Sequence, residues 1–347
     1  MKPLRVALIG YGLAGSVFHA PLVAATPGLR LASIVTSDGG RREQVRRDHP
    51  DVAVIGGPDE LWQRPGDHDI VVIAAPNSAH VRLSREALDT GLAVVVDKPL
   101  AATAAEARAR VEDARAAGRF LTVFQNRRWD SDHLTLGRLL SAGVLGEVLR
   151  YESRFERWRP DLRPGAWREA DPPAAGGGVL LDLGSHLVDQ AVSLFGPPVD
   201  VHAEIDSRRG GPADDDAFLA LRHRSGAVSH LWMSAVAAAP GPRLRVLGSR
   251  AAFVVDEVDG QEGALRAGGR PGGPSEWGVE PEERWGRLVA GERVEPVPSE
   301  PGAWPRFYAE LERALRVGGP PPVDPVDAVG VLEVLDRARE VAAARGR

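Results

Sequence analysis

The feature that most constrains the fold of this chain is the regular alternation of short apolar runs with helical patterns along its first third. Apolar runs lie at residues 6–9, 31–35, 52–55, 70–74, 92–96 and 120–124, and helical patterns lie at 12–25, 41–48, 59–63, 78–90 and 103–117. Because the apolar runs lack a two-residue alternation, we expect strands of a parallel sheet that helices cover on both faces. Residues 1–124 are therefore expected to form a doubly wound Rossmann domain that binds a dinucleotide.

Residues 125–347 show a different pattern. Runs with a two-residue period lie at 147–157, 199–205, 217–223, 227–236, 243–247 and 251–255, and Arg224-Ser225-Gly226 between two of them indicates a hairpin. Helices are expected at 131–142, 179–194, 304–317 and 324–344, and the glycine- and proline-rich residues 256–303 are expected to form loops. We expect an α+β domain with a large, open, mostly antiparallel sheet for substrate binding and oligomerisation, whose last helices pack back on the Rossmann domain.

The composition excludes several classes of function. The 347 residues include no cysteine, which rules out disulfides, thiolate metal sites and a cysteine nucleophile. The net charge of −5 comes from interspersed charges of both signs, so no nucleic-acid partner is expected. No apolar stretch reaches the length of a signal peptide or of a ~20-residue membrane span. These features favour a cytoplasmic protein without a metal or a membrane partner.

A glycine-rich turn follows the first apolar run and opens the first helical pattern. Its residues are Gly10, Tyr11, Gly12, Leu13, Ala14 and Gly15, which fit the pattern G-x-G-x-x-G. The three glycines allow a tight turn, a close approach to a pyrophosphate, and close packing of helix on strand. The helix N-terminus adds unpaired N–H groups for the phosphates. The motif alone is common in bland structural turns, but its place in a doubly wound domain favours a dinucleotide.

The end of the second strand indicates which nicotinamide nucleotide is bound. An NAD-binding domain usually places a carboxylate there, for the adenosine 2′-hydroxyl. In this chain the strand ends in Thr36 and Ser37, and Arg41 and Arg42 follow shortly after. Hydroxyls together with a guanidinium suit a 2′-phosphate, so we favour NADP over the alternative, NAD. The competing interpretation is that both arginines are solvated residues on a surface helix.

Three polar residues are candidates for catalysis. Lys98 follows the fifth apolar run, at the sheet edge where ligands of such folds bind, and can hydrogen-bond a substrate hydroxyl. Asp182 and His186 are four residues apart, so on a helix they share one face. His186 is suited to taking a proton from a hydroxyl, and Asp182 could orient it or bind an adjacent hydroxyl. The alternatives are a surface lysine and a structural, hydrogen-bonded histidine.

Four motifs in this order resemble the Gfo/Idh/MocA oxidoreductases, and the similarity extends from Arg5 to the last helix. They are the glycine-rich turn at 10–15, Ala75-Pro76-Asn77-Ser78-Ala79-His80, Asp97-Lys98-Pro99 and Asp182-x-Gly184-x-His186. The resemblance implies that Lys98, Asp182 and His186 are catalytic. It also implies that the turn containing Ala75, Pro76, Asn77 and His80 lies along the nicotinamide ribose, with Lys98 beside the cofactor. Asp97 departs from the family pattern, which has a glutamate there; the shorter side chain keeps the negative charge but has less reach toward Lys98.

Further segments are similar to one branch of that family. Val17-Phe18-His19-Ala20-Pro21, Gln125-Asn126-Arg127-Arg128-Trp129-Asp130 and Trp167-Arg168-Glu169 resemble an NADP-preferring branch that includes scyllo-inositol dehydrogenases. This resemblance implies that Trp167 and Arg168 lie near the nicotinamide and the substrate. It also implies a homodimer or homotetramer that assembles through the open face of the C-terminal sheet.

The combined prediction is hydride transfer between NADP(H) and a hydroxyl carbon of a sugar or an inositol-like polyol. Either Lys98 or His186 can be the base, because the two groups could share one proton. Two alternatives stay open: a relative that retains NAD and cleaves glycosides or eliminates by transient oxidation, and a non-catalytic dinucleotide sensor. Phe155, Arg157, Trp158, Trp167 and Arg168 either line a sugar pocket or pack between domains, and the arginines would also suit a carboxylated sugar.

Overall fold

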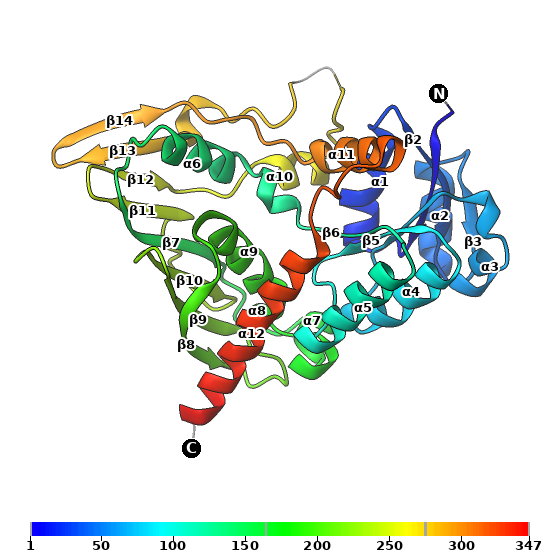
Figure 1. Cartoon of the computed structure of the whole chain (residues 1–347), viewed down its shortest axis with the longest axis horizontal. Coiled ribbons are helices and arrows are strands. Elements are labelled where there is room, and N and C mark those ends of the chain that lie inside the picture. Colours follow the sequence, from blue (N-terminus) through cyan, green and yellow to red (C-terminus); the bar gives the residue numbers. More distant parts are fainter. Residues whose placement is uncertain (1, 164, 274–275, 346–347) are drawn as a thin grey trace.

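Six parallel strands form the first sheet, in the order β3-β2-β1-β4-β5-β6 (Figure 1). The structure is a computed structural model that describes residues 2–163, 165–273 and 276–345. The strands are β1 (Leu4–Ile9), β2 (Leu29–Val35), β3 (Ala53–Ile55), β4 (Ile70–Ile73), β5 (Ala93–Asp97) and β6 (Leu121–Phe124). Each lies on one of the six apolar runs, and β1, β4 and β5 are the central strands that helices bury on both faces. The predicted doubly wound sheet is confirmed.

Helices cover both faces of this sheet. They are α1 (Ala20–Ala24), α2 (Gly39–Asp48), α3 (Pro58–Trp62), α4 (Asn77–Asp89) and α5 (Ala104–Ala116). The first expected helix, 12–25, differs from the prediction because it begins with a π-helical segment, Ala14–His19, before α1. The π-helical segment begins at Ala14, within the last two residues of the glycine-rich turn. The turn is thus connected to an irregular helix start, a feature that sequence periodicity does not reveal.

Eight strands form the second sheet, in the order β14-β13-β12-β11-β7-β10-β9-β8. They are β7 (Val148–Glu156), β8 (Pro198–Asp206), β9 (Asp216–His223), β10 (Val228–Ser234), β11 (Leu244–Gly248), β12 (Ala252–Val255), β13 (Gly286–Ala290) and β14 (Arg293–Val297). All neighbouring pairs are antiparallel except β10 and β7, which are parallel. The mostly antiparallel sheet and the β9–β10 hairpin at Arg224–Gly226 are as predicted.

The expectation of loops over residues 256–303 is wrong in two places. Residues Gln261–Arg266 form the short helix α10, and β13 and β14 extend the sheet as an edge hairpin. Both strands are short, and most of their side chains are half-buried or exposed. Such an edge hairpin needs little apolar alternation, so the two-residue pattern that marks the inner strands is weak there.

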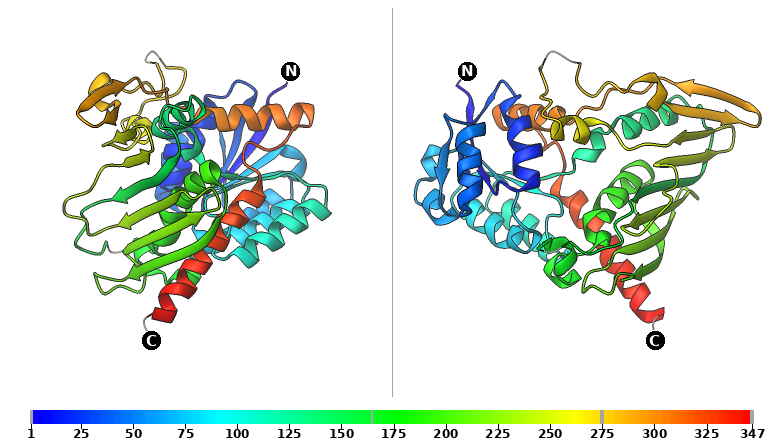
Figure 2. Two further views of the ribbon diagram at one scale, coloured as in Figure 1. Left: turned by 60° about the vertical axis from the view of Figure 1, so that its left-hand side comes forward. Right: turned by 180° about the vertical axis from the view of Figure 1, so that it is seen from behind.

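Helices cover only one face of the second sheet (Figure 2). They are α6 (Ser131–Ser141), α8 (Val179–Asp182) and α9 (Gly184–Phe195), together with the last helix of the chain, whereas the short helix α7 (Trp167–Ala170) lies in the segment between β7 and α8. The helix expected at 179–194 is interrupted at Leu183, where α8 ends and α9 begins. The last two helices, α11 (Pro305–Val317) and α12 (Pro325–Arg345), contact the Rossmann helices α1 and α5 respectively, and α12 also contacts β8 and α9.

The apolar core joins the two domains. One buried cluster contains Val94 of β5, Leu187 of α9 and Leu335 of α12, which are all inaccessible to solvent. A second cluster places Phe307 of α11 against Phe124 of β6, with ring centroids 4.9 Å apart. Through α11 and α12 these clusters connect the Rossmann sheet to the helices of the second domain. In the described parts of the chain, no helix has the length and apolarity needed to cross a membrane.

Candidate active site

The glycine-rich turn leaves no room for side chains at two of its positions. Gly10 has φ +96°, and a Cβ there would lie 2.4 Å from the carbonyl oxygen of Ala74. A Cβ on Gly15 would lie 2.1 Å from the carbonyl oxygen of Gly10. The Tyr11 side chain points away, because its hydroxyl donates to Asp48 Oδ2 at 3.0 Å. Tyr11 thus anchors the turn on α2 and can offer a nucleotide only its backbone.

Arg41 lies over this turn. Its guanidinium is 3.9 Å from the position that a Cβ on Gly12 would occupy. The neighbouring polar groups have local structural roles: Asp38 Oδ1 caps α2 by accepting from the Arg41 backbone N–H at 2.8 Å, and Arg42 Nε donates to the Thr36 carbonyl at 2.9 Å. Within the described residues, no hydrogen bond or ion pair engages the Arg41 guanidinium. It is therefore available to an anion bound at the turn.

The other residues expected to contact the cofactor have different environments. At the end of β2, Thr36 is buried and Ser37 is exposed. In the glycine-rich turn, Leu13 and Ala14 line a cavity that is described below. In the turn before α4, Ala75 is half-buried, Pro76 is exposed and Asn77 is buried. Asn77 Nδ2 donates to the carbonyl of Gly176 at 2.8 Å, which ties α4 to the second domain. The ring nitrogens of His80 lie 2.7 Å from the Pro99 oxygen and 2.9 Å from the Ala75 oxygen. The His80 side chain is thus fully buried and links the turn at Ala75 to the turn at Pro99.

Lys98 meets Asp182 across the domain boundary. Its Nζ donates to the backbone carbonyl of Asp182 at 2.6 Å and to Asp182 Oδ1 at 2.8 Å. Arg168 Nε donates to the same Oδ1 at 3.1 Å, and the Arg168 guanidinium lies 4.3 Å from the ring centroid of half-buried Trp167. Burial alone would raise the pKa of Asp182, but the charges of Lys98 and Arg168 outweigh it and hold that pKa well below its usual range. Asp182 is therefore a permanent carboxylate.

His186 lies in the first turn of α9, beside the Phe155 ring at a centroid distance of 6.3 Å. Its Nδ1 is buried and has no hydrogen-bond partner among the described residues, so Asp182 does not orient the ring. Burial, with the nearby charges of Lys98 and Arg127, lowers the pKa of His186 well below its usual value. His186 is therefore a neutral imidazole at neutral pH, able to accept a proton or a hydrogen bond.

One cavity of about 360 Å³ contains the two candidate proton-transfer groups. Its lining comprises Leu13, Ala14, Phe18, Asp97, Lys98, Phe124, Asn126, Arg127, Phe155, Glu156, Arg157, Arg159, Arg163, Arg168, Asp182, Leu183, His186, Val258, Glu262, Arg266 and Trp304. Lys98 and His186 thus face one space next to the glycine-rich turn. Of the residues whose role stayed open, Phe155, Arg157 and Arg168 line this cavity, whereas Trp158 is 57% exposed outside it.

Sequence reasoning missed several charged residues of this cavity. Arg127 pairs with Glu262 at 3.0 Å and lies 4.6 Å from the Phe155 ring centroid. Glu262 also pairs with Arg266 at 2.8 Å. The spacing of Glu262 and Arg266, four residues apart with Leu265 between them, is a helix signal that the glycine-rich surroundings obscured.

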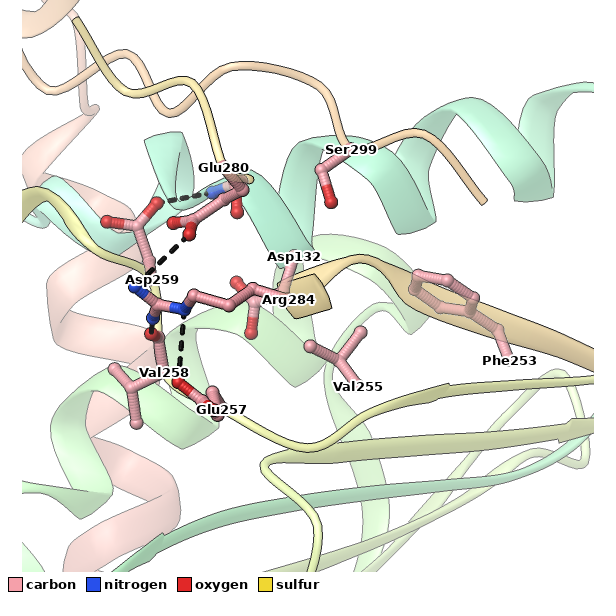
Figure 3. Close-up of a pocket in the computed structure, with 10 residues that line it drawn as sticks. Asp132, Phe253, Val255, Glu257, Val258, Asp259, Glu280, Arg284 and Ser299 are labelled. Atoms are coloured by element: carbon pink, nitrogen blue, oxygen red, sulfur yellow. Dashed lines mark hydrogen bonds and ion pairs between the residues drawn. The ribbon is translucent and has the colours of Figure 1, made fainter. Parts of the chain in front are cut away.

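A second, much smaller cavity lies next to the start of α10 (Figure 3). Asp259 Oδ2 accepts from the Ser131 backbone N–H at 2.7 Å, and burial raises the pKa of Asp259 to about 6. Glu280 accepts from the Gly260 backbone N–H at 2.6 Å and pairs with Arg284 at 3.3 Å. In Figure 3 these side chains point toward one another. Their charges therefore hold the start of α10 in place, which presents Glu262 to the larger cavity.

A buried chain of polar groups lies behind Lys98. Asp97 Oδ1 accepts from the Lys98 backbone N–H at 2.9 Å and lies 3.7 Å from His19 Nε2. His19 Nδ1 is 2.6 Å from the Tyr308 hydroxyl. Burial would raise the pKa of Asp97, but His19 and Lys98 more than offset this and lower it. The shorter carboxylate at this position is thus charged and contacts the backbone of Lys98 directly.

Comparison with known proteins places the chain in a family. The family model for the oxidoreductase family with an NAD-binding Rossmann fold matches residues 4–125, and that for the GFO/IDH/MocA C-terminal domain matches residues 133–254. The chain belongs to the Gfo/Idh/MocA oxidoreductase family. It is therefore an NAD(P)-dependent oxidoreductase whose glycine-rich turn lies in the nucleotide-binding domain of this family.

Individual Gfo/Idh/MocA relatives are similar along nearly the whole chain. The uncharacterised oxidoreductase YdgJ of Escherichia coli is 41% identical, over 98% of this chain and 96% of its own length. The NADP⁺-dependent scyllo-inositol 2-dehydrogenase IolW of Bacillus subtilis is 33% identical, over 97% of this chain and 93% of its own length. The solved structure of the oxidoreductase yvaA from Bacillus subtilis superposes with a TM-score of 0.92 at 32% identity, covering 99% and 97% of the two chains.

Proposed function

We propose that this chain is an NADP(H)-dependent dehydrogenase that transfers a hydride between the nicotinamide and a hydroxyl carbon of a sugar or cyclic polyol. The observation that carries the proposal is the placement of Lys98 and His186 in one cavity next to the glycine-rich turn. The turn itself suits the nucleotide, because Gly10 and Gly15 are packed so closely against the protein backbone that only glycine fits, as a tight dinucleotide-binding turn requires. The nucleotide supplies the hydride acceptor or donor, and the protein supplies binding and orientation.

The proton chemistry follows from the charge states of the cavity. Lys98 is held by the Asp182 carbonyl and carboxylate, so its ammonium has a fixed position from which to donate to a substrate oxygen. His186 is neutral and its Nδ1 has no protein partner among the described residues. As the hydride leaves carbon, the hydroxyl proton passes to His186 or is relayed through Lys98.

NADP is proposed over NAD because of Arg41. An exposed guanidinium over the turn can pair bidentately with a 2′-phosphate, and Asp38, the nearest carboxylate to the strand end, is engaged as a helix cap. The relative IolW carries NADP⁺ in its name, which also supports this choice. Under this proposal Arg41 contributes most to the binding of the 2′-phosphate.

The direct test is a screen of sugars, inositols and aldehydes with NADP⁺, NAD⁺ and their reduced forms, followed by absorbance of the reduced nicotinamide. We expect net turnover of at least one polyol or sugar, with a higher kcat/KM for the 2′-phosphorylated nucleotide. Retained nucleotide without net reduction would contradict the proposal and favour an enzyme that oxidises its substrate only transiently. Nucleotide binding without turnover of any compound would favour a sensor.

We further propose that two copies of the chain associate through the open face of the second sheet. Phe218 and Trp232 lie on that face with ring centroids 5.1 Å apart, and Arg154 lies 3.8 Å above the Trp232 ring. Eight strands at about 4.8 Å spacing and about 20 Å length give roughly 750 Å², near the ~800 Å² that each partner of a standard interface contributes. Light scattering should show a dimer or tetramer that Trp232→Glu dissociates; an unchanged mass would contradict this arrangement.

A further inference from the structure

Two arginines project into the cavity from the end of β7 on a fixed backbone. Arg157 N–H donates to the Ser234 carbonyl at 3.0 Å, and Arg159 N–H donates to the Ala235 carbonyl at 2.8 Å. The pairing continues the β7–β10 contact beyond the sheet. Because alternate residues of an extended chain point the same way, Arg157 and Arg159 both line the cavity while Trp158 between them is exposed. The two guanidinium groups are therefore placed together by the fold.

The guanidinium groups of Arg157 and Arg159 differ from the other arginine side chains of the cavity in their pairing. Among the residues that the structure describes, no hydrogen bond or ion pair engages the side chain of Arg157 or Arg159. The other arginine of this loop that lines the cavity, Arg163, is paired with Glu169 at 2.8 Å. Long cationic side chains with an accessible carboxylate normally pair with it. The positive charges of Arg157 and Arg159 are thus not paired with a carboxylate in the cavity wall.

Among the carboxylates of the lining, Glu156 accepts from the Gly241 backbone N–H at 2.8 Å, and two others already have cations of their own. Asp182 is shared by Lys98 and Arg168, and Glu262 is shared by two further arginines of the cavity. Asp182 and Glu262 are thus each paired with two cations, and neither of these cations is Arg157 or Arg159. Burial, with the charges of its neighbours Arg159 and Arg163, lowers the pKa of Arg157, although Asp182 and Glu262 oppose this. The cavity carries an excess of positive charge that a bound anion would neutralise.

The groups proposed to hold the cofactor's phosphates lie in the other domain. The glycine-rich turn and Arg41 belong to the Rossmann domain, whereas Arg157 and Arg159 belong to the second domain, on the wall that also carries Asp182 and His186. We infer that Arg157 and Arg159 bind an anionic group of the substrate, a carboxylate or a phosphate, so that the substrate is an acidic rather than a neutral sugar or polyol. This inference rests on the proposed dehydrogenase function. Paired guanidinium groups suit such oxyanions because they donate in a planar fork.

Matched substrates test the inference on the full-length, NADP⁺-loaded enzyme. D-glucose, D-glucuronate and D-glucose 6-phosphate, and likewise myo-inositol and an inositol monophosphate, are compared by kcat and KM and by calorimetric binding. We expect kcat/KM or affinity for a charged member to exceed that for its neutral counterpart by roughly 10- to 100-fold, the usual effect of a charge-assisted contact. The carboxylate and phosphate arms distinguish the two sources of negative charge.

Variants assign the effect to the two arginines. Arg157→Gln and Arg159→Gln should each remove most of the preference for the charged member, mainly through KM, and Arg157→Lys should retain part of it because the charge stays. The matched control is Arg224→Gln, since Arg224 is exposed in the β9–β10 hairpin, outside the cavity. Cofactor affinity, followed by titration with NADPH, should be unchanged in all four variants.

The outcomes separate this inference from the proposed function. Turnover of neutral members as efficient as that of charged ones, unaffected by Arg157→Gln, would overturn the inference and leave the dehydrogenase intact. Binding of a charged member that depends on Arg157, without turnover, would support the anion site and count against the dehydrogenase. Weaker NADPH binding in Arg157→Gln with unchanged substrate selectivity would assign the arginines to the nucleotide and overturn the inference. If no charged member were bound or turned over, the inference would also be overturned.

Discussion

The ammonium of Lys98 donates to the backbone carbonyl of Asp182 as well as to its carboxylate, at 2.6 and 2.8 Å. In an uninterrupted helix that carbonyl would accept from the backbone N–H of His186. Instead, the His186 N–H bonds the Leu183 carbonyl at 3.2 Å, and the helix is interrupted at Leu183. The lysine of the Rossmann domain thus bonds the last residue of α8, at the break after which α9 and His186 begin. This contact fixes Lys98 beside the break between the two helices.

Removing the Lys98 ammonium should therefore impair catalysis far more than cofactor binding. We expect Lys98→Met, which keeps the aliphatic stem, to lower kcat by about 10²–10⁴-fold, the usual contribution of a positioned acid or base. Lys2→Met is the matched control, because Lys2 is the only other lysine of the sequence. Stopped-flow turnover and NADPH fluorescence titration measure the two effects separately. Nearly unchanged turnover with intact nucleotide binding would show that Lys98 has no catalytic role.

The neutral state of His186 predicts the acidic side of the pH profile. Burial and the charges of Lys98 and Arg127 hold its pKa well below 6.5, so the proton acceptor is lost only as the pH falls through that lowered value. For alcohol oxidation, kcat/KM should stay level from about pH 8 down to the ordinary histidine pKa of about 6.5 and decline only below it. His186→Asn should lower kcat and remove this limb. An acidic limb centred at or above the ordinary pKa would contradict the assignment.

The same pKa shift has a consequence for stability. A histidine whose pKa is lower in the folded than in the unfolded chain contributes stability above the unfolded pKa, and this contribution is lost as the pH falls toward the folded value. The free energy of unfolding of the wild type should thus decrease with acidification below about pH 6.5, and less steeply so in His186→Asn. Urea unfolding at a series of pH values gives both slopes, and parallel slopes would show that His186 does not titrate on unfolding.

The glycine-rich turn allows a sharp comparison of two glycines. A Cβ on Gly15 would lie 2.1 Å from the Gly10 carbonyl oxygen, so Gly15→Ala must displace the turn and should abolish nucleotide binding. Gly137, within α6, has no atom near its Cβ position, and Gly137→Ala should raise the free energy of unfolding by about 0.5–1 kcal/mol. Nucleotide titration and urea unfolding measure the two effects. Normal affinity in Gly15→Ala would mean that the turn does not hold the nucleotide.

How far the sequence alone predicts this structure differs between fold and site. The buried parallel strands were predictable because each is a continuous apolar run, and the second sheet because its inner strands alternate. The edge hairpin β13–β14 was not, because half-exposed edge strands have no such pattern. The spacing of Asp182 and His186 led to both residues. The interruption between them was hidden, because it involves a lysine 84 positions away.

The arginines show the same limit. A sequence rich in arginine does not indicate which guanidinium groups are paired, since ion pairs such as that of Arg128 with Asp189 join residues 61 positions apart. The unpaired state of Arg157 becomes visible only when every neighbouring carboxylate has been placed. His80 is the opposite case: its family motif suggested a contact with the cofactor, and the fold places both its ring nitrogens against backbone carbonyls.

Cofactor preference should depend on Arg41 more than on any other residue of α2. Its guanidinium lies over Gly12, whereas that of Arg42 is bound to the Thr36 carbonyl. Arg41→Ala should weaken NADP⁺ binding by roughly 10- to 100-fold, the worth of a charge-assisted bidentate contact, and leave NAD⁺ binding within about twofold. Arg46→Ala, exposed on the same helix, is the matched control.

Ionic strength provides an independent check of this cofactor assignment. Because the Arg41 side chain is exposed, its attraction to a 2′-phosphate is screened by salt, so the preference of the wild type for NADP⁺ should decrease between low and physiological ionic strength. Arg41→Ala should show little of this dependence, since the screened charge pair is gone. If Arg41→Ala weakened both nucleotides equally, the guanidinium would be contacting the pyrophosphate that they share, and the preference for NADP would need another source.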